Sequence, residues 1–419
     1  MSPADVHGKA VDRRSDSPVS RRVNAVPADR PYICVLGVYG KGNIGDEALL
    51  AAIADAVRET LGDVDVVVFG SDAVEVERRF SIPAVSRAPF PGFRAKLKVL
   101  RKAEAIVLGG GTLLCDHGGF FNDLRAVASV FFWPFLGRML GVPGLVYAQG
   151  LGPVTEWPVR LAVRHLLTRM TAISLRDRRS AELLQAITGS ARTCPVTCDP
   201  VVAAERFQPD VISAGMSGQL RETTNRLTPY CIVSFRSPAE RPHNPERYYM
   251  ECGEALGDYH AEHRIRFVLF PALLSDTSPD DRIGLEILER SLVQRGVPGE
   301  DISWAGWDDL DEGVALLQHA RVAVGDRLHA LLFAAMAGVP VIAIDIEDKI
   351  PGCLEMIACG RLCAVFSPLD VKSRPFIDAL HAARLAGDPD RRQLRQRVSR
   401  WASEDSRNRA LLADVVDLR

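Results

Sequence analysis

Short apolar runs alternate with longer amphipathic segments along the first half of the chain. The runs are rich in β-branched residues, which favour strands, and they occupy residues 33–37, 64–69, 105–108, 145–148 and 172–175. Residues 46–60 repeat apolar positions at helical spacing, so this segment is expected to be a helix with one apolar face. The alternation predicts a parallel sheet with crossover helices.

The same alternation of strand-like and helical segments returns in the second half of the chain, after an interruption. Residues 204–229 are polar and lack sustained periodicity, and strand-like runs resume at 230–235, 265–270, 322–325 and 339–344. A chain of 419 residues exceeds what one hydrophobic core usually supports. We therefore predict an α/β protein with two domains, residues 31–203 and 230–419, joined by a linker over 204–229. The arginine-rich, helical tail after Leu369 either packs across both domains or ends as a frayed helix.

Each domain is expected to be Rossmann-like, with an open, doubly wound parallel sheet. Sheets of this kind bind ligands at the carboxyl ends of their strands, so two of them facing each other place the site in the cleft between the domains. Functional side chains are therefore expected directly after strands.

Composition excludes several classes of protein. With 47% hydrophobic and 25% charged residues the chain is typical of a globular protein, and its net charge of -2 gives no electrostatic reason to expect nucleic acid as a partner. Residues 1–30 lack the apolar region of a secretory signal, so we expect a disordered leader. Nine cysteines without a Cys-x-x-Cys pair fit reduced thiols in a cytoplasmic protein.

Two further segments are given structural interpretations. The most apolar stretch, residues 127–147, contains Pro134, Arg138 and Pro143, so it is expected to be a buried helix followed by a strand, with a membrane-facing surface as the alternative. His260 and His263 lie three residues apart without a third ligand nearby. We interpret them as surface histidines and predict no metal site.

A glycine-rich turn, GKGNIGDE at 40–47, follows the first predicted strand and opens the first helix. Such a turn lets backbone N–H groups and a helix N-terminus face an anion, which makes Asn43, Gly45 and Asp46 candidate site residues. The turn contains the pattern G-x-G-x-x-G, but the acidic residue of a dinucleotide site is only approximately matched by Asp72. The alternative is a tight connection in which Asp46 stabilises the helix N-terminus.

Three more strand ends carry glycine or polar residues. The sequence GGGT at 109–112 leads to Asp116 and His117, QGLGP occupies 149–153, and Arg176 and Asp177 follow the next strand. Adjacent glycines permit close approach of a ligand to the backbone, although a flexible crossover is the alternative. The candidate residues of these segments are Gly110, Gly111, Gln149 and Arg176.

In the second domain the segment GDRLH at 325–329 joins a strand to a helix. Asp326 is expected to cap a helix over 327–337 that Gly338 closes, which places Arg327 and His329 in the first helical turn. An arginine there is unfavourable against the helix dipole unless negative charge lies close by. We therefore predict a bound phosphate or carboxylate beside Arg327 and His329.

The chain resembles the polysaccharide pyruvyl transferase family in the sequence, order and spacing of three segments. These are GNIGDEA at 42–48, GGGTLL at 109–114 and GDRLHA at 325–330. Four further segments agree with this family: QGLGP at 149–153, LRD at 175–177 with Ser180, Asp199-Pro200 and Asp348-Lys349. The resemblance covers about residues 32–360 and is most specific in the first and last of the three segments.

The resemblance implies a GT-B-like fold, phosphoenolpyruvate as donor substrate, no other cofactor, and a cell-surface saccharide or its precursor as acceptor. It makes His329 the essential histidine, Arg327 and Arg176 donor-binding arginines, and Asp46 the acidic residue of the first turn, with Lys349 as a further binding residue. We expect His329 to act as general acid and Asp46 to take a proton from an acceptor hydroxyl, or the two roles to be exchanged.

Three other functions stay open at this point. A GT-B glycosyltransferase would use the same cleft for a nucleotide-sugar donor, and a nucleotide-dependent oxidoreductase would use the G-x-G-x-x-G turn. A non-catalytic paralogue would bind a glycan or a partner enzyme. The family also implies lipid-linked acceptors at the cytoplasmic face of the membrane, in which case residues 127–140 or the basic tail would contact lipid.

Overall fold

The computed structural model of the chain describes most of its length, and the predicted leader lies almost wholly outside the described part. Asp116, His117 and Asp348 also lie outside it. The described residues are 30–115, 120–189, 194–227, 229–240, 244–275, 279–346 and 349–419, without the side chains of 120–124.

Seven parallel strands form the first sheet, and all five apolar runs predicted as strands in this half belong to it. The order is β3-β2-β1-β4-β6-β5, with β7 also paired to β6. The short strands β3 and β5 were not predicted, and β5 begins at Gly111 inside the predicted glycine turn. The strands are β1 (Tyr32–Leu36), β2 (Asp65–Gly70), β3 (Ala84–Ser86), β4 (Ile106–Leu108), β5 (Gly111–Leu114), β6 (Gly144–Leu151) and β7 (Ala172–Leu175).

Helices cover both faces of this sheet, because its buried strands present apolar side chains to both faces. In β1, Ile33 and Val35 pack into a core with α2, whereas Cys34 and Leu36 belong to a second core with α4 and α5. The helices are α2 (Ile44–Leu61), α3 (Ala73–Phe80), α4 (Phe93–Lys102), α5 (Phe120–Met139), α6 (Trp157–Leu167) and α7 (Arg178–Thr188).

The apolar segment 127–147 forms the second half of α5 and the start of β6. Trp133 is buried as predicted, but Phe135 and Met139 are exposed, so the helix is buried on one side only. Within the described ranges, no helix is both long and apolar enough to cross a membrane.

Short helices, rather than irregular chain, connect the first sheet to the second. They are α8 (Pro200–Ala203), the 3-10 turn η1 (Glu205–Phe207), α9 (Pro209–Gly215) and α10 (Gly218–Leu227). Their shortness explains why the sequence shows no sustained periodicity there, since each contributes at most three turns.

The second sheet has six parallel strands in the order β10-β9-β8-β11-β12-β13, which is the doubly wound order 3-2-1-4-5-6 within this half. The four runs predicted as strands supply β8, β9, β11 and β12, and the short strands β10 and β13 were not predicted. The strands are β8 (Tyr230–Ser234), β9 (Arg266–Leu269), β10 (Ile302–Trp304), β11 (Val322–Gly325), β12 (Val341–Ile344) and β13 (Cys363–Phe366).

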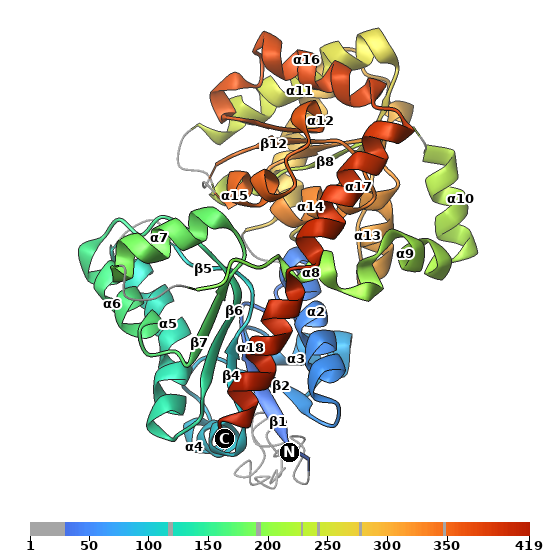
Figure 1. Cartoon of the computed structure of the whole chain (residues 1–419). Coiled ribbons are helices and arrows are strands. Elements are labelled where there is room, and N and C mark those ends of the chain that lie inside the picture. Colours follow the sequence, from blue (N-terminus) through green and yellow to red (C-terminus); the bar gives the residue numbers. More distant parts are fainter. Residues whose placement is uncertain are drawn as a thin grey trace, which may run out of the picture.

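The helices of this half cover both faces of the second sheet and continue into the C-terminal tail (Figure 1). They are α11 (Pro245–His263), α12 (Asp281–Gln294), α13 (Leu310–Gln318), α14 (Leu328–Met336), α15 (Lys349–Met356), α16 (Arg374–Leu385), α17 (Asp388–Ala402) and α18 (Asp405–Asp417), with 3-10 turns η2 (Pro238–Glu240), η3 (Gly299–Asp301), η4 (Gly360–Leu362) and η5 (Pro368–Asp370).

The C-terminal tail packs across both halves of the molecule, which is the first of the two alternatives left by the sequence. Figure 1 shows α17 and α18 running from the second sheet down the side of the first. Helix α17 contacts α14 and α8, and α18 contacts α2, β6 and β7. The Trp401 indole donates to the carbonyl of Thr197 at 2.9 Å, and Arg409 pairs with Glu59 of α2. One hydrophobic cluster runs through α2, α13, α14, α17 and α18, so the tail holds the two halves together.

Candidate active site

A cavity of about 480 Å³ is lined by residues from both halves of the molecule, at the carboxyl ends of their strands. Its size is typical of a small-molecule site. It brings together eight of the residues singled out from the sequence: Asn43, Gly45, Asp46, Gly111, Arg176, Arg327, His329 and Lys349.

Gly110 and Gln149 do not line this cavity. A Cβ at Gly110 would lie 3.0 Å from Leu49 Cδ2 and in ordinary contact with Pro200, so this glycine faces packed side chains. Gln149 is fully buried and donates from Nε2 to the carbonyl of Gly111 at 2.5 Å. Gly111 has a φ of 97°, a conformation that favours glycine, so Gln149 holds the strained start of β5 behind the cavity.

The glycine-rich turn is held closed by Glu47, to which the sequence analysis gave no role. Its Oε1 accepts N–H groups from Gly40 at 2.9 Å and Gly42 at 3.3 Å. Asn43 caps α2 by accepting the N–H of Gly45 at 3.0 Å, which leaves Asp46 free of a capping role. Burial first, and then the charge of Asp46, raise the pKa of Glu47 to about 7 against the opposing effects of Arg79 and the two N–H donors.

Replacing Glu47 by glutamine is expected to change how stability depends on pH. The folded carboxyl has a pKa of about 7 and the ordinary value is 4.5, so the folded protein retains a proton that the unfolded chain releases between these values. The unfolding free energy of the wild type therefore falls by about 3 kcal/mol as pH rises through this window. The unfolding free energy of the Glu47→Gln variant does not show this decrease, because glutamine does not titrate. Urea unfolding of both proteins at pH 4.5 and pH 8 measures the difference, and parallel pH profiles would contradict the assignment.

His329 lies in the first turn of α14, and its ring packs directly on Gly45 of α2. A Cβ at position 45 would overlap the Nδ1 and Cγ atoms of His329. On its other side, the Nε2 of His329 lies 3.3 Å from Oδ2 of Asp199, an ion-pair distance. The imidazole is thus fixed between a glycine of the first half and a carboxylate that precedes α8.

Gly45→Ala is expected to lower activity by roughly 10²-fold. The added methyl group displaces the His329 ring by about 1 Å, and misplacing a reacting group by that distance lowers the rate by about this factor. Alanine has a higher helix propensity than glycine, so thermal stability is expected to be retained. Gly215→Ala, in α9 with open space around the glycine, is the matched control. Equal turnover by the Gly45→Ala variant and the wild type would contradict the packing argument.

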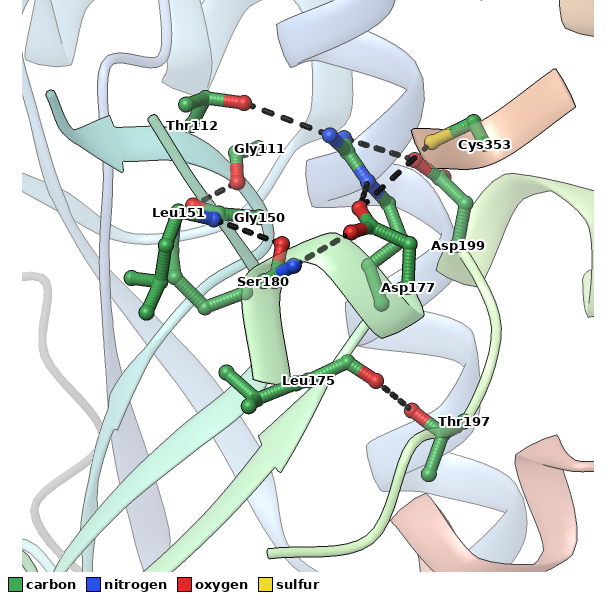
Figure 2. Close-up of polar contacts among 12 residues, drawn as sticks. Gly111, Thr112, Gly150, Leu151, Leu175, Asp177, Ser180, Thr197, Asp199 and Cys353 are labelled. Atoms are coloured by element: carbon green, nitrogen blue, oxygen red, sulfur yellow. Dashed lines mark hydrogen bonds and ion pairs between the residues drawn. The ribbon is translucent and has the colours of Figure 1, made fainter. Parts of the chain in front are cut away.

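Arg176 is almost fully buried, and its guanidinium contacts three polar side chains. Figure 2 shows these partners, Thr112, Asp177 and Asp199, close to one another. The guanidinium lies 3.3 Å from Asp199 Oδ2 and 3.4 Å from Asp177 Oδ2, and it donates to Thr112 Oγ1 at 3.3 Å. Burial alone would lower the pKa of Arg176, but Cys353, Asp199 and Asp177 together raise it. Asp199 therefore bridges Arg176 and His329 through the same oxygen.

Asp199 is ionised by this arrangement. Burial alone would raise the pKa of Asp199, but His329 and Arg176 outweigh burial and lower it. The carboxylate also accepts the N–H of Val201 at 3.2 Å as the cap of α8. The sequence identified Asp199 only as part of an Asp-Pro pair and did not predict that it contacts His329.

The prediction that Arg327 needs a bound anion is wrong, because the chain supplies the negative charge itself. Arg327 donates from Nε to Asp281 Oδ2 at 2.9 Å, from Nη2 to the other oxygen of Asp281, and from Nη2 to Glu240 at 2.7 Å. Burial alone would lower the pKa of Arg327, but these carboxylates raise it. Asp281 also accepts the backbone N–H groups of Ser237 and Leu273, so it ties three loops together.

The predicted helix cap is also wrong. Helix α14 starts at Leu328, and Arg327 is its N-cap residue in an extended conformation. The carboxylate of Asp326 accepts the backbone N–H of Arg236 at 2.7 Å and is directed at the neighbouring strand end instead of at the helix. His329 still falls in the first turn, as predicted.

Several charged residues of the cavity act on Asp46. Burial raises the pKa of Asp46, and His329, Lys349 and Arg327 act against this effect. Among the described residues the carboxylate of Asp46 makes no hydrogen bond and no ion pair. Its carboxylate is therefore available to a ligand.

The cavity lining carries more positive than negative charge. Five lining side chains are cationic and two are carboxylates. Arg176 and Arg327 are neutralised by Asp177, Asp199, Asp281 and Glu240, so the remaining cations beside Asp46 are Arg87, Arg236 and Lys349. Arg236 and Arg87 were missed by the sequence analysis. Arg236 directly follows a predicted strand and was open to the same argument as Arg176, whereas Arg87 follows β3, which the sequence did not reveal. The cationic residues are Arg87, Arg176, Arg236, Arg327 and Lys349, and the carboxylates are Asp46 and Glu240.

Two other sequence interpretations are corrected by the structure. Asp72, which approximately matched the ribose-binding residue of a dinucleotide site, caps α3 by accepting N–H groups from Val74 and Glu75. His260 is buried, not exposed, and its Nδ1 contacts the carbonyl of Ile265. His263 contacts the ring of His381 at 2.7 Å, a contact that a single N–H···N hydrogen bond explains.

Comparison with solved structures identifies the fold. HepE of Anabaena in complex with UDP superposes with a TM-score of 0.61 at 13% identity, over 91% of this chain and 100% of that one. UDP-GlcNAc 2-epimerase from Neisseria meningitidis bound to UDP-GlcNAc gives 0.60 at 12%, over 87% and 94%. The UDP-forming α,α-trehalose-phosphate synthase of Burkholderia xenovorans gives 0.52 at 13%, over 91% and 100%. At these identities the similarity shows the fold alone, and the protein is GT-B-like, as predicted.

Sequence comparison identifies the family. No curated protein sequence matches the chain significantly. The model of the family described as polysaccharide pyruvyl transferase matches residues 43–348, well over half of the chain. The matched region includes Asp46, Arg176 and His329 of the cavity. The chain therefore belongs to the polysaccharide pyruvyl transferase family.

Proposed function

We propose that the protein transfers the pyruvyl group of phosphoenolpyruvate to two hydroxyls of a cell-surface saccharide or its precursor, forming a cyclic ketal and releasing phosphate. Family membership supports this reaction class. The observation that carries the proposal is a cavity in which the carboxylate of Asp46 and the imidazole of His329 lie among cationic lining residues. A donor with both a carboxylate and a phosphate suits the other cationic residues of the lining, Arg87, Arg236 and Lys349.

The reaction requires proton transfer in both directions. C3 of the enol gains one proton, and the C2–O bond to the phosphate breaks, so that phosphate departs with the bridging oxygen and one proton. Two acceptor hydroxyls each form a bond to C2 and lose one proton. Two protons are thus gained and two are lost, so one acid and one base suffice when each acts twice.

We propose that His329 and Asp46 form this acid and base pair. The burial that raises the pKa of Asp46 makes it a stronger base than an exposed carboxylate, and it lies free of hydrogen bonds to described residues. Asp199 is an ion-pair partner for a protonated His329, which supports His329 as the proton donor. The opposite assignment uses the same two groups.

Arg176 and Arg327 take a different role from the one that the resemblance implies. Each is already neutralised by two carboxylates, so neither offers a free charge to the donor. We propose that Arg176 positions His329 through Asp199, and that Arg327 positions the loops around Asp281. Lys349 lines the same cavity and acts on Asp46 electrostatically, which supports a binding role for it.

Ligand-dependent thermal stability tests the donor. A ligand at 100 times its Kd stabilises the folded protein by about 2.7 kcal/mol, which is measurable as a rise in Tm. We expect stabilisation by phosphoenolpyruvate and none by UDP- or GDP-sugars. The reverse result would favour a glycosyltransferase, and stabilisation by NAD alone would favour an oxidoreductase.

A further inference from the structure

Arg87 differs from the other arginines of the cavity whose contacts are known. It directly follows β3, is partly buried, and lines the cavity on the side of the first sheet. Across the described ranges of the chain, its guanidinium makes no hydrogen bond and no ion pair. Arg176 and Arg327, in contrast, each contact two carboxylates.

The backbone of Arg87 is held rigidly. Its N–H donates to the carbonyl of Gly70 at 2.8 Å, and its own carbonyl accepts the indole N–H of Trp133 at 2.6 Å. Trp133 is fully buried and packs edge-on against Phe69 with ring centroids 5.0 Å apart. The base of the side chain is therefore fixed to the core while its charged end is left to the cavity.

A partly buried guanidinium without a partner is unfavourable, because it loses water without gaining a carboxylate. Burial accordingly lowers the pKa of Arg87, and the nearby charge of Asp46 opposes this effect. His329 also acts electrostatically on Asp46, so Arg87 and His329 both lie near this carboxylate. An anion held by Arg87 would thus lie beside the groups proposed to transfer protons.

We propose that Arg87 is a binding residue for an anionic group, carboxylate or phosphate, of the donor substrate. A guanidinium offers two parallel N–H donors that match either group. The identity of the donor as phosphoenolpyruvate rests on the proposed function, whereas the role of Arg87 as anion receptor rests on its position and its lack of a carboxylate partner among the described residues.

Calorimetric titration of the full chain tests the proposal with phosphoenolpyruvate, pyruvate, inorganic phosphate and UDP as probes. Arg87→Gln is expected to weaken phosphoenolpyruvate binding by roughly 10- to 100-fold, as expected for loss of a hydrogen bond to a charged group. Arg87→Lys is expected to recover part of the loss, since it keeps the charge without the fork. Arg94→Gln, an exposed position on α4, is the matched control and should bind like the wild type.

The probes also separate the two anionic groups of the donor. A larger loss for pyruvate than for phosphate assigns Arg87 to the carboxylate, and the opposite result assigns it to the phosphate. Without ligand, Arg87→Gln is expected to be at least as stable as the wild type, because it removes an uncompensated charge. A lower Tm of the unliganded variant would contradict the absence of a carboxylate partner.

The outcomes for Arg87 and for the donor are distinguishable. An Arg87→Gln variant that binds every probe as tightly as the wild type would overturn the role of Arg87. A wild type that binds UDP but not phosphoenolpyruvate would contradict the proposed function, while weaker UDP binding by the variant would still support Arg87 as an anion receptor. A wild type that binds none of the probes would overturn both.

Discussion

Replacement of His329 by glutamine is expected to lower turnover of phosphoenolpyruvate by roughly 10²- to 10⁴-fold, the usual contribution of a general acid or base. Glutamine is similar in size and keeps a polar end near Asp199, but it cannot exchange a proton at neutral pH. The ring is 15% exposed and faces the cavity, so the core is unaffected and the variant should unfold at nearly the wild-type temperature.

His165→Gln provides the matched control, because this histidine is exposed on α6 and does not line the cavity. Steady-state rates at saturating phosphoenolpyruvate separate the chemical step from donor binding. A His329→Gln variant with a near-normal rate would remove His329 from the mechanism, whatever the family resemblance implies.

Asp199→Asn is expected to reduce both activity and stability. The carboxylate contacts His329 and Arg176 through one oxygen, and an amide cannot neutralise either group. We expect roughly 10⁴-fold lower turnover, by analogy with loss of the carboxylate that orients a catalytic histidine. Leaving Arg176 buried with Asp177 as its remaining carboxylate is expected to cost about 3 kcal/mol of unfolding free energy.

The pH dependence of this stability loss has a definite sign. The pKa of Asp199 is lowered in the folded protein, so its contribution is present above the ordinary value of 3.8 and is lost as pH falls through the lower folded value. Urea unfolding should therefore separate the variant from the wild type at pH 7 and bring them together in acid. Asp72→Asn, the same change in a carboxylate that caps α3, should show neither effect.

The sequence predicted the sheets well because their strands are buried on both faces and read as continuous apolar runs. It missed β3, β5, β10 and β13, which stand at the ends of the two strand orders and are not buried along their whole length, so they lack a continuous apolar run. It predicted a site at strand ends, and the structure brings Asp46, His329 and Lys349 to one cavity there. This followed from topology alone, which directs the carboxyl ends of parallel strands to one edge.

Long-range charge pairing could not be predicted. The partners of Arg327 are 46 and 87 residues away in the sequence, and no local pattern marks Asp281 or Glu240 as its neighbours. The helix-dipole argument was sound in requiring negative charge beside Arg327, but it could not say whether the chain or a ligand supplies that charge. Arg87, which contacts no carboxylate among the described residues, was missed because it follows β3, a strand that the sequence did not reveal.

Acceptor-dependent release of phosphate from phosphoenolpyruvate tests the central claim most directly. The protein is incubated with phosphoenolpyruvate and a panel of free, nucleotide-linked and lipid-linked saccharides, and phosphate and product mass are followed together. The account predicts phosphate release in equal amount with a saccharide that is heavier by one pyruvyl ketal, and neither product with His329→Gln. Transfer of a sugar from a nucleotide donor to the same panel, without consumption of phosphoenolpyruvate, would contradict it.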